Sequence, residues 1–169
     1  MRKDDIQLSS LPCYNKRMKY EIIRTETMRL VGFAARTNNG APDCGAVIGS
    51  LWQKYFKAFG YARASYCVYT DYAGDETDDY TAFVGCEGDA LPSGGRAVEI
   101  PAGLYVAISL DCTIGDAPRA VAQFWQKLWT GGLPRAFVAD FEEYGAEGVR
   151  VCIRVNEEDL ETWRQTIRS

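Results

Sequence analysis

The chain has 169 residues, of which 47% are hydrophobic and 25% charged, and it carries a net charge of −4. This is the size and composition of one globular domain, and no basic stripe for nucleic acid is visible. No stretch approaches the roughly 20 apolar residues that span a bilayer, and the first twenty residues lack the apolar segment of a secretory signal. We therefore expect a cytoplasmic protein whose direct partners include neither membrane nor nucleic acid.

After a polar lead-in over residues 1–18, the first half of the chain predicts two strands, a helix and two further strands. The helix is indicated by apolar residues at helical spacing from Ile48 to Phe59, and Gly60 is a typical end. The strands are short runs rich in aromatic and β-branched residues. These predicted elements are Tyr20–Arg24, Leu30–Arg36, the helix Gly45–Phe59, Ser65–Asp71 and Tyr80–Gly85.

The second half predicts the same succession of elements. Its helix has Asp116 as N-cap, Pro118 in the first turn and an apolar stripe from Val121 to Trp129. A polar segment that starts at Asn156 predicts a short C-terminal helical tail. The predicted elements are Arg96–Ile100, Gly103–Leu110, the helix Ala117–Thr130, Arg135–Tyr144, Val149–Val155 and the tail over residues 156–169.

The two halves are related by an internal repeat. The segment LWQKYF at 51–56 returns as FWQKLW at 124–129, a spacing of 73 residues. The chain therefore predicts a β-β-α-β-β unit written twice, with repeat one over 19–88 and repeat two over 95–155. We expect an α+β fold with an antiparallel sheet, one main helix per repeat, pseudo-twofold symmetry and a ligand cleft between the halves.

Metal and cofactor chemistry receives no support from the sequence. Histidine is absent, and none of the six cysteines forms a Cys-x-x-Cys pair, so we expect no metal site and no cofactor. The acidic segment Asp75–Asp79 lacks the spacing of a calcium loop and is expected to be a solvated loop. The cysteines are expected to be reduced thiols, several of them in the core.

Four segments together resemble the GyrI-like small-molecule-binding domains, also called AraC-type effector-binding domains, the ligand modules of multidrug-responsive regulators. The resemblance covers Lys19–Val155 and implies a duplicated β-β-α-β-β fold, in agreement with the repeat. The matching segments are YCVYTDY at 66–72, VEIPAGLYVAISL at 98–110, FWQKLW at 124–129 and DFEEY at 140–144.

The resemblance implies a function centred on Glu142, which takes the place of the acidic residue in the family's ligand cleft. It implies a free-standing protein that binds a small hydrophobic or aromatic, drug-like and often cationic ligand. Two alternatives stay open. One is a hydrolase of electrophilic toxins that uses Glu142 and Tyr144, and the other is a protein-interaction role such as gyrase inhibition. A regulatory protein partner or a homodimer is also left open.

The residues themselves support a ligand site at Glu142. Strand alternation places Glu142 and Tyr144 on one face, where a carboxylate beside aromatic rings suits an organic cation. The opposing interpretation is an exposed strand carboxylate beside an edge tyrosine. Further candidates are aromatic side chains that could equally be core: Tyr105, Trp125, Trp129, Tyr69, Phe83, Trp52 and Tyr55.

The charge and the length of the lead-in generate a first prediction. Because the chain is acidic and residues 1–18 are too few for a helix-turn-helix unit, we expect no sequence-specific DNA binding by the purified chain. A gel-shift titration at several salt concentrations measures this. A sequence-specific shift that weakens steeply with salt would contradict the prediction, since counterion release gives DNA complexes that signature.

Overall fold

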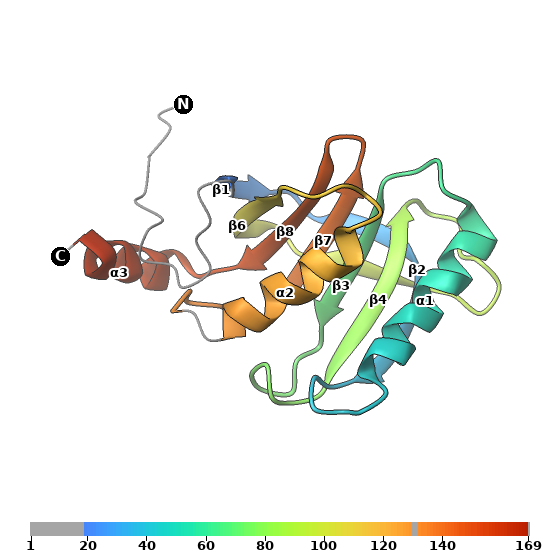
Figure 1. Cartoon of the computed structure of the whole chain (residues 1–169), viewed down its shortest axis with the longest axis horizontal. Coiled ribbons are helices and arrows are strands. Elements are labelled where there is room, and N and C mark those ends of the chain that lie inside the picture. Colours follow the sequence, from blue (N-terminus) through green and yellow to red (C-terminus); the bar gives the residue numbers. More distant parts are fainter. Residues whose placement is uncertain (1–18, 130–131, 169) are drawn as a thin grey trace.

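A computed structural model describes residues 19–129 and 132–168 of the chain (Figure 1). The predicted lead-in over residues 1–18 and the predicted helix end at Thr130 lie outside the described residues. The elements in chain order are β1 Lys19–Thr25, β2 Met28–Thr37, α1 Cys44–Phe59, β3 Ser65–Thr70, β4 Tyr80–Glu87, β5 Arg96–Ile100, β6 Gly103–Leu110, α2 Ala117–Trp129, β7 Ala139–Gly145, β8 Gly148–Arg154 and α3 Glu157–Arg168. None of the described helices is long and apolar enough to cross a membrane.

Every predicted helix and strand is present, and one predicted boundary is wrong by more than two residues. The strand expected from Arg135 begins only at Ala139. Phe137 has a φ of 52°, in the left-handed region, which cannot continue a strand. Arg135 instead forms a single bridge with Val155, so the segment before β7 is irregular.

All eight strands form one sheet in the order β1-β6-β8-β7-β3-β4-β2-β5. Each neighbouring pair is antiparallel. When each strand is replaced by its equivalent in the other predicted repeat (β1 by β5, β2 by β6, β3 by β7, β4 by β8), the same strand order is obtained from the opposite edge of the sheet. At the centre, Val68 of β3 pairs with Phe141 of β7, which lies 73 residues later, the spacing of the repeated helix motif. The topology is therefore that of a duplicated unit, and the limits of the two repeats at 19–88 and 95–155 stay a prediction.

The sheet has two unlike faces. Figure 1 shows α1 and α2 on the same face. The buried side chains of the other face come from strands across the whole sheet and pack against one another, which curls the sheet into a half-barrel. On the helix side, α1 packs over β2 and β4, while α2 packs over β6 and β8.

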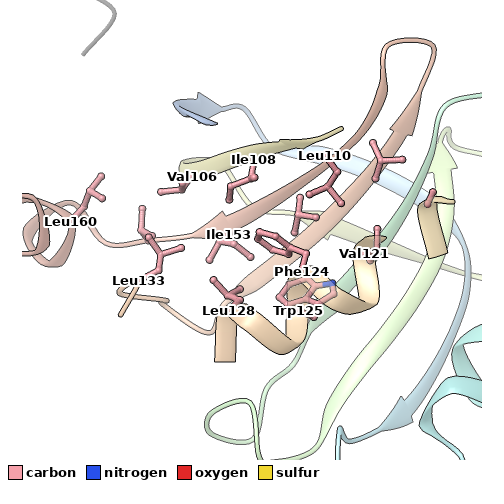
Figure 2. Close-up of a cluster of buried hydrophobic side chains, with 14 residues drawn as sticks. Val106, Ile108, Leu110, Val121, Phe124, Trp125, Leu128, Leu133, Ile153 and Leu160 are labelled. Atoms are coloured by element: carbon pink, nitrogen blue, oxygen red, sulfur yellow. The ribbon is translucent and has the colours of Figure 1, made fainter. Parts of the chain in front are cut away.

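The two main helices bury equivalent positions against the sheet. Leu51 and Tyr55 of α1 are 2% and 0% exposed, and their counterparts Phe124 and Leu128 of α2 are both 4% exposed. Figure 2 shows Phe124 and Leu128 in one cluster with Ile153 of β8. The sequence repeat is thus also a repeat of the packing, because the same helical positions carry apolar side chains in both halves.

Five cysteines lie within the described residues, and all five are free. Cys67, Cys86 and Cys152 are buried in the core, as the apolar strands around them predict. Cys13 lies outside the described residues. No group of three or more cysteine and carboxylate side chains within residues 19–129 and 132–168 is placed to hold a metal ion.

This packing generates a stability prediction. We expect Leu51→Ala to lower the free energy of unfolding by about 2–5 kcal/mol, because the side chain is 2% exposed and its loss leaves a cavity under α1. The exposed Gln53 on the same helix is the control, and Gln53→Ala should change the free energy by less than about 0.5 kcal/mol. Urea unfolding of both variants measures the difference, and equal effects would show that α1 is not anchored through Leu51.

Candidate functional site

A cavity of about 1210 Å³ lies between the two main helices, with the central strands β3 and β7 at its base. Each helix contributes side chains at equivalent positions four residues apart, so the cavity sits between the repeats. These are Ile48, Trp52 and Phe56 from α1, and Val121, Trp125 and Trp129 from α2. The sheet and its loops add Tyr69, Tyr72, Tyr80, Arg135, Glu142 and Tyr144.

Glu142 is 2% exposed and is held by three neutral donors. One carboxylate oxygen, Oε1, accepts hydrogen bonds from the Tyr69 hydroxyl at 2.7 Å and from the Trp125 indole Nε1 at 2.7 Å. The other oxygen, Oε2, accepts one from the Tyr144 hydroxyl at 2.6 Å. None of the salt bridges within the described residues involves Glu142. The carboxylate is therefore hydrogen-bonded while its charge has no paired cation.

The electrostatics of the site follow from this burial. Desolvation raises the pKa of Glu142, and the hydrogen bonds from Tyr144, Tyr69 and Trp125 work in the opposite direction without cancelling it. Burial and the nearby carboxylate raise the pKa of both tyrosines. Both hydroxyls consequently stay protonated near neutral pH and remain donors to Glu142.

Aromatic rings pack edge to face around the carboxylate. Trp52 contacts the Tyr144 ring with centroids 5.0 Å apart, and Trp125 contacts the Tyr69 ring at 5.2 Å. Each helix thus places one tryptophan against one of the tyrosines that hold Glu142. Such edge-to-face pairs are the favoured aromatic geometry, so the walls of the cavity are preorganised.

Glu142 and Tyr69 occupy equivalent positions of the two repeats. Tyr69 and Glu142 are 73 residues apart, so they are equivalent positions of β3 and β7, and they hydrogen-bond to each other. The duplicated fold therefore puts a tyrosine on β3 and a glutamate on β7 at equivalent positions of the central strand pair. The alternation of β7 and the repeat spacing together could have paired these two residues from the sequence.

A second polar cluster adjoins the cavity. Asp140 is fully buried and accepts hydrogen bonds from Arg135 Nη2 at 2.7 Å, from the Tyr72 hydroxyl at 2.9 Å and from the backbone nitrogen of Arg154 at 2.8 Å. Arg135 and Tyr72 line the cavity. Strand alternation puts Asp140 on the same face as Glu142, but the sequence did not predict its contact with Arg135, because Arg135 lies in the irregular segment before β7.

Six of the nine candidate residues line the cavity: Glu142, Tyr144, Trp125, Trp129, Tyr69 and Trp52. The structure does not bring the other three there. Tyr55 faces the sheet beneath α1. Phe83 and Tyr105 belong to the opposite face, since strand alternation turns them away from the helices, and the Tyr105 hydroxyl donates to the Pro101 carbonyl at 2.9 Å. Tyr72, Tyr80 and Arg135 are lining residues that the sequence did not single out.

Comparison with known proteins agrees with this architecture. The family model described as integron-associated effector binding protein matches residues 21–164. An integron cassette protein from the mobile metagenome of Vibrio cholerae is 21% identical, with a TM-score of 0.67 over 83% of this chain and 99% of its own. No curated protein matches the sequence at a significant level.

Two further solved structures share the fold. SAV2435 bound to tetraphenylphosphonium is 13% identical, with a TM-score of 0.61 over 86% of this chain and 99% of its own. A protein described as a bacterial transcription regulation protein, from Staphylococcus aureus, is 14% identical, with a TM-score of 0.58 over 80% of this chain and 97% of its own. Together with the family match, these structures confirm the resemblance to GyrI-like ligand-binding domains.

The buried acid generates a prediction for stability against pH. The pKa of Glu142 is raised in the folded protein above its ordinary value of 4.5, so the folded state binds the proton more tightly than the unfolded state. The free energy of unfolding should therefore fall as the pH rises from about 4.5 through the folded-state pKa, and Glu142→Gln should lose this component. Urea unfolding of both proteins from acidic to neutral pH measures it. A difference between them that grows in favour of the wild type with rising pH would mean a lowered pKa and contradict the prediction.

Proposed function

The chain belongs to the family of integron-associated effector-binding proteins, and we propose that it binds a small aromatic cation in the cavity between α1 and α2 without converting it. One observation carries this proposal: the carboxylate of Glu142 is 2% exposed at the cavity wall, and its hydrogen-bond donors among the described residues are all neutral. A positive ligand supplies the opposite charge that this arrangement lacks.

The energetics favour a cation over a neutral ligand of the same shape. Burial of an ionised carboxylate costs free energy, and three hydrogen bonds offset only part of that cost. Because the Glu142 carboxylate is buried, its attraction to a bound cation is weakly screened. The rings of Trp52, Tyr69 and Trp125 add cation–π attraction of about 0.5–2 kcal/mol for each well-placed contact.

The size and composition of the cavity support the same class of ligand. About 1210 Å³ is room for a drug-sized molecule. Two equivalent helix stripes present flat apolar surfaces to it, which suits a ligand with several rings. SAV2435, which shares the fold, is bound to tetraphenylphosphonium, a cation with four aromatic rings. This likeness supports tetraphenylphosphonium as a probe for the present protein.

The proposal predicts a selective effect of charge removal. Glu142→Gln keeps the side-chain shape, and the rotatable Tyr144 hydroxyl can accept from the new amide group where it donated before. We expect its affinity for tetraphenylphosphonium to fall at least about tenfold, or roughly 1.4 kcal/mol. Affinity for the neutral triphenylphosphine oxide should change much less. Calorimetric titration of both proteins with both compounds measures this.

The matched control is Glu143→Gln, one residue along the same strand. Glu143 points to the opposite face and pairs with Arg150, so this variant has the same net charge change and an intact cavity. It should bind tetraphenylphosphonium as the wild type does. Equal losses in both variants would show that Glu142 acts only through overall charge. Incubation with an electrophilic cyclopropane compound, followed by chromatography, separates binding from hydrolysis by Glu142 and Tyr144, and we expect that compound to be recovered unchanged.

A further inference from the structure

The guanidinium of Arg135 is buried beside the cavity, and three of its five N–H groups have no hydrogen-bond partner among the described residues. Its side chain is 6% exposed, and the residue lines the cavity. Within the part of the chain that the structure describes, Nε and Nη1 are buried and have no hydrogen-bond partner. Buried donors without a partner are rare in proteins, since each costs about 1–3 kcal/mol.

Contacts on three sides hold Arg135 in place. Nη2 donates to the Asp140 carboxylate at 2.7 Å, and to the Tyr72 hydroxyl at 3.3 Å. The guanidinium carbon lies 4.4 Å from the centre of the Phe137 ring. The nearest other carboxylate oxygen is Glu76 Oε2, at 3.9 Å from Nη1, which is too long for a hydrogen bond. The pairing with Asp140 therefore explains why the side chain is fixed. It does not provide hydrogen-bond acceptors for Nε and Nη1.

Arg135 and Glu142 both contact one aromatic ring. Trp125 donates from Nε1 to Glu142, while the guanidinium carbon of Arg135 lies 5.5 Å from the centre of the Trp125 ring. The wall of the cavity at Trp125 therefore carries an acceptor residue, Glu142, and a donor residue, Arg135.

We propose that Arg135 binds a hydrogen-bond acceptor of the ligand, so that the preferred ligand is an aromatic molecule with a cationic group at Glu142 and a carboxylate or carbonyl group at Arg135. This inference rests on the proposed function and narrows its ligand class. Arginine suits the role because its guanidinium keeps its charge when buried and a free N–H group can donate a hydrogen bond to a carboxylate or carbonyl oxygen. Asp140 then acts as a positioning residue, because it holds the guanidinium through Nη2 while Nε and Nη1 have no hydrogen-bond partner among the described residues.

The test compares two ligands that differ only in one acceptor group. Tetraphenylphosphonium and (4-carboxyphenyl)triphenylphosphonium share the cation and the four rings, and the second adds a carboxylate. We expect Arg135→Met to weaken binding of the carboxylate compound at least about tenfold and that of tetraphenylphosphonium less than about twofold. The double variant Arg135→Met, Asp140→Asn, which leaves no unpaired buried carboxylate at residue 140, should show the same selectivity.

The controls separate this inference from a structural role and from the proposed function. Arg119→Met, an exposed change on α2 outside the cavity, should leave both affinities unchanged. If Arg135→Met and the double variant weaken both ligands equally, or neither, Arg135 is structural and the inference is overturned while the proposed function stands. If wild-type protein binds neither compound, the proposed function fails and the inference fails with it.

Discussion

The buried carboxylate of Glu142 is the interaction on which the rest of the site depends. Removing this carboxylate from water costs free energy, and hydrogen bonds offset part of that cost. The donors come from three separate elements and bind its two oxygens. Tyr69 comes from β3, Trp125 from α2 and Tyr144 from β7 itself. The position of α2 over the sheet is thereby tied to the charge at the centre, and the aromatic walls of the cavity are placed by the same hydrogen bonds.

Duplication explains how a small chain builds a cavity of this size. Each helix uses one set of positions to pack on the sheet and an adjacent set to face the other helix. Since the two units meet at β3 and β7, the side chains that face inward come in equivalent pairs. At the centre the pair is Tyr69 and Glu142, so a nearly symmetric frame carries a carboxylate in one half and a neutral hydroxyl at the equivalent position of the other half.

The two polar clusters differ in how completely they are satisfied. Asp140 is hydrogen-bonded at both oxygens and paired with Arg135, as expected for a structural buried charge. Glu142 is hydrogen-bonded without a paired cation, and Arg135 is paired without full hydrogen bonding. Incomplete satisfaction of buried polar groups costs stability, and such local costs concentrate where a protein binds ligands. The two incomplete groups also lie next to the same tryptophan.

The sequence alone determined the elements, the repeat and the position of the acid. Helical spacing and strand alternation are local properties, so they predicted α1, α2 and most of the strands, and the 73-residue spacing predicted the symmetric topology. Alternation in β7 also put Glu142 and Tyr144 on one face, toward the cavity. The motif resemblance added the role of Glu142, which the residue pattern by itself left undecided.

Only the tertiary structure decided which aromatic residues reach the cavity and what holds the charges. Tyr55, Phe83 and Tyr105 are aromatic residues of the same kind as Trp52 and Tyr69. Tyr55 lies on the side of α1 that packs on the sheet, and Phe83 and Tyr105 lie on the face of the sheet turned away from the helices. The contact between Arg135 and Asp140 depends on Phe137, whose left-handed backbone ends the regular pattern before β7. Local periodicity cannot anticipate such positions, because one left-handed residue breaks the alternation of a strand and because the face that an element buries is set by packing against partners distant in the chain.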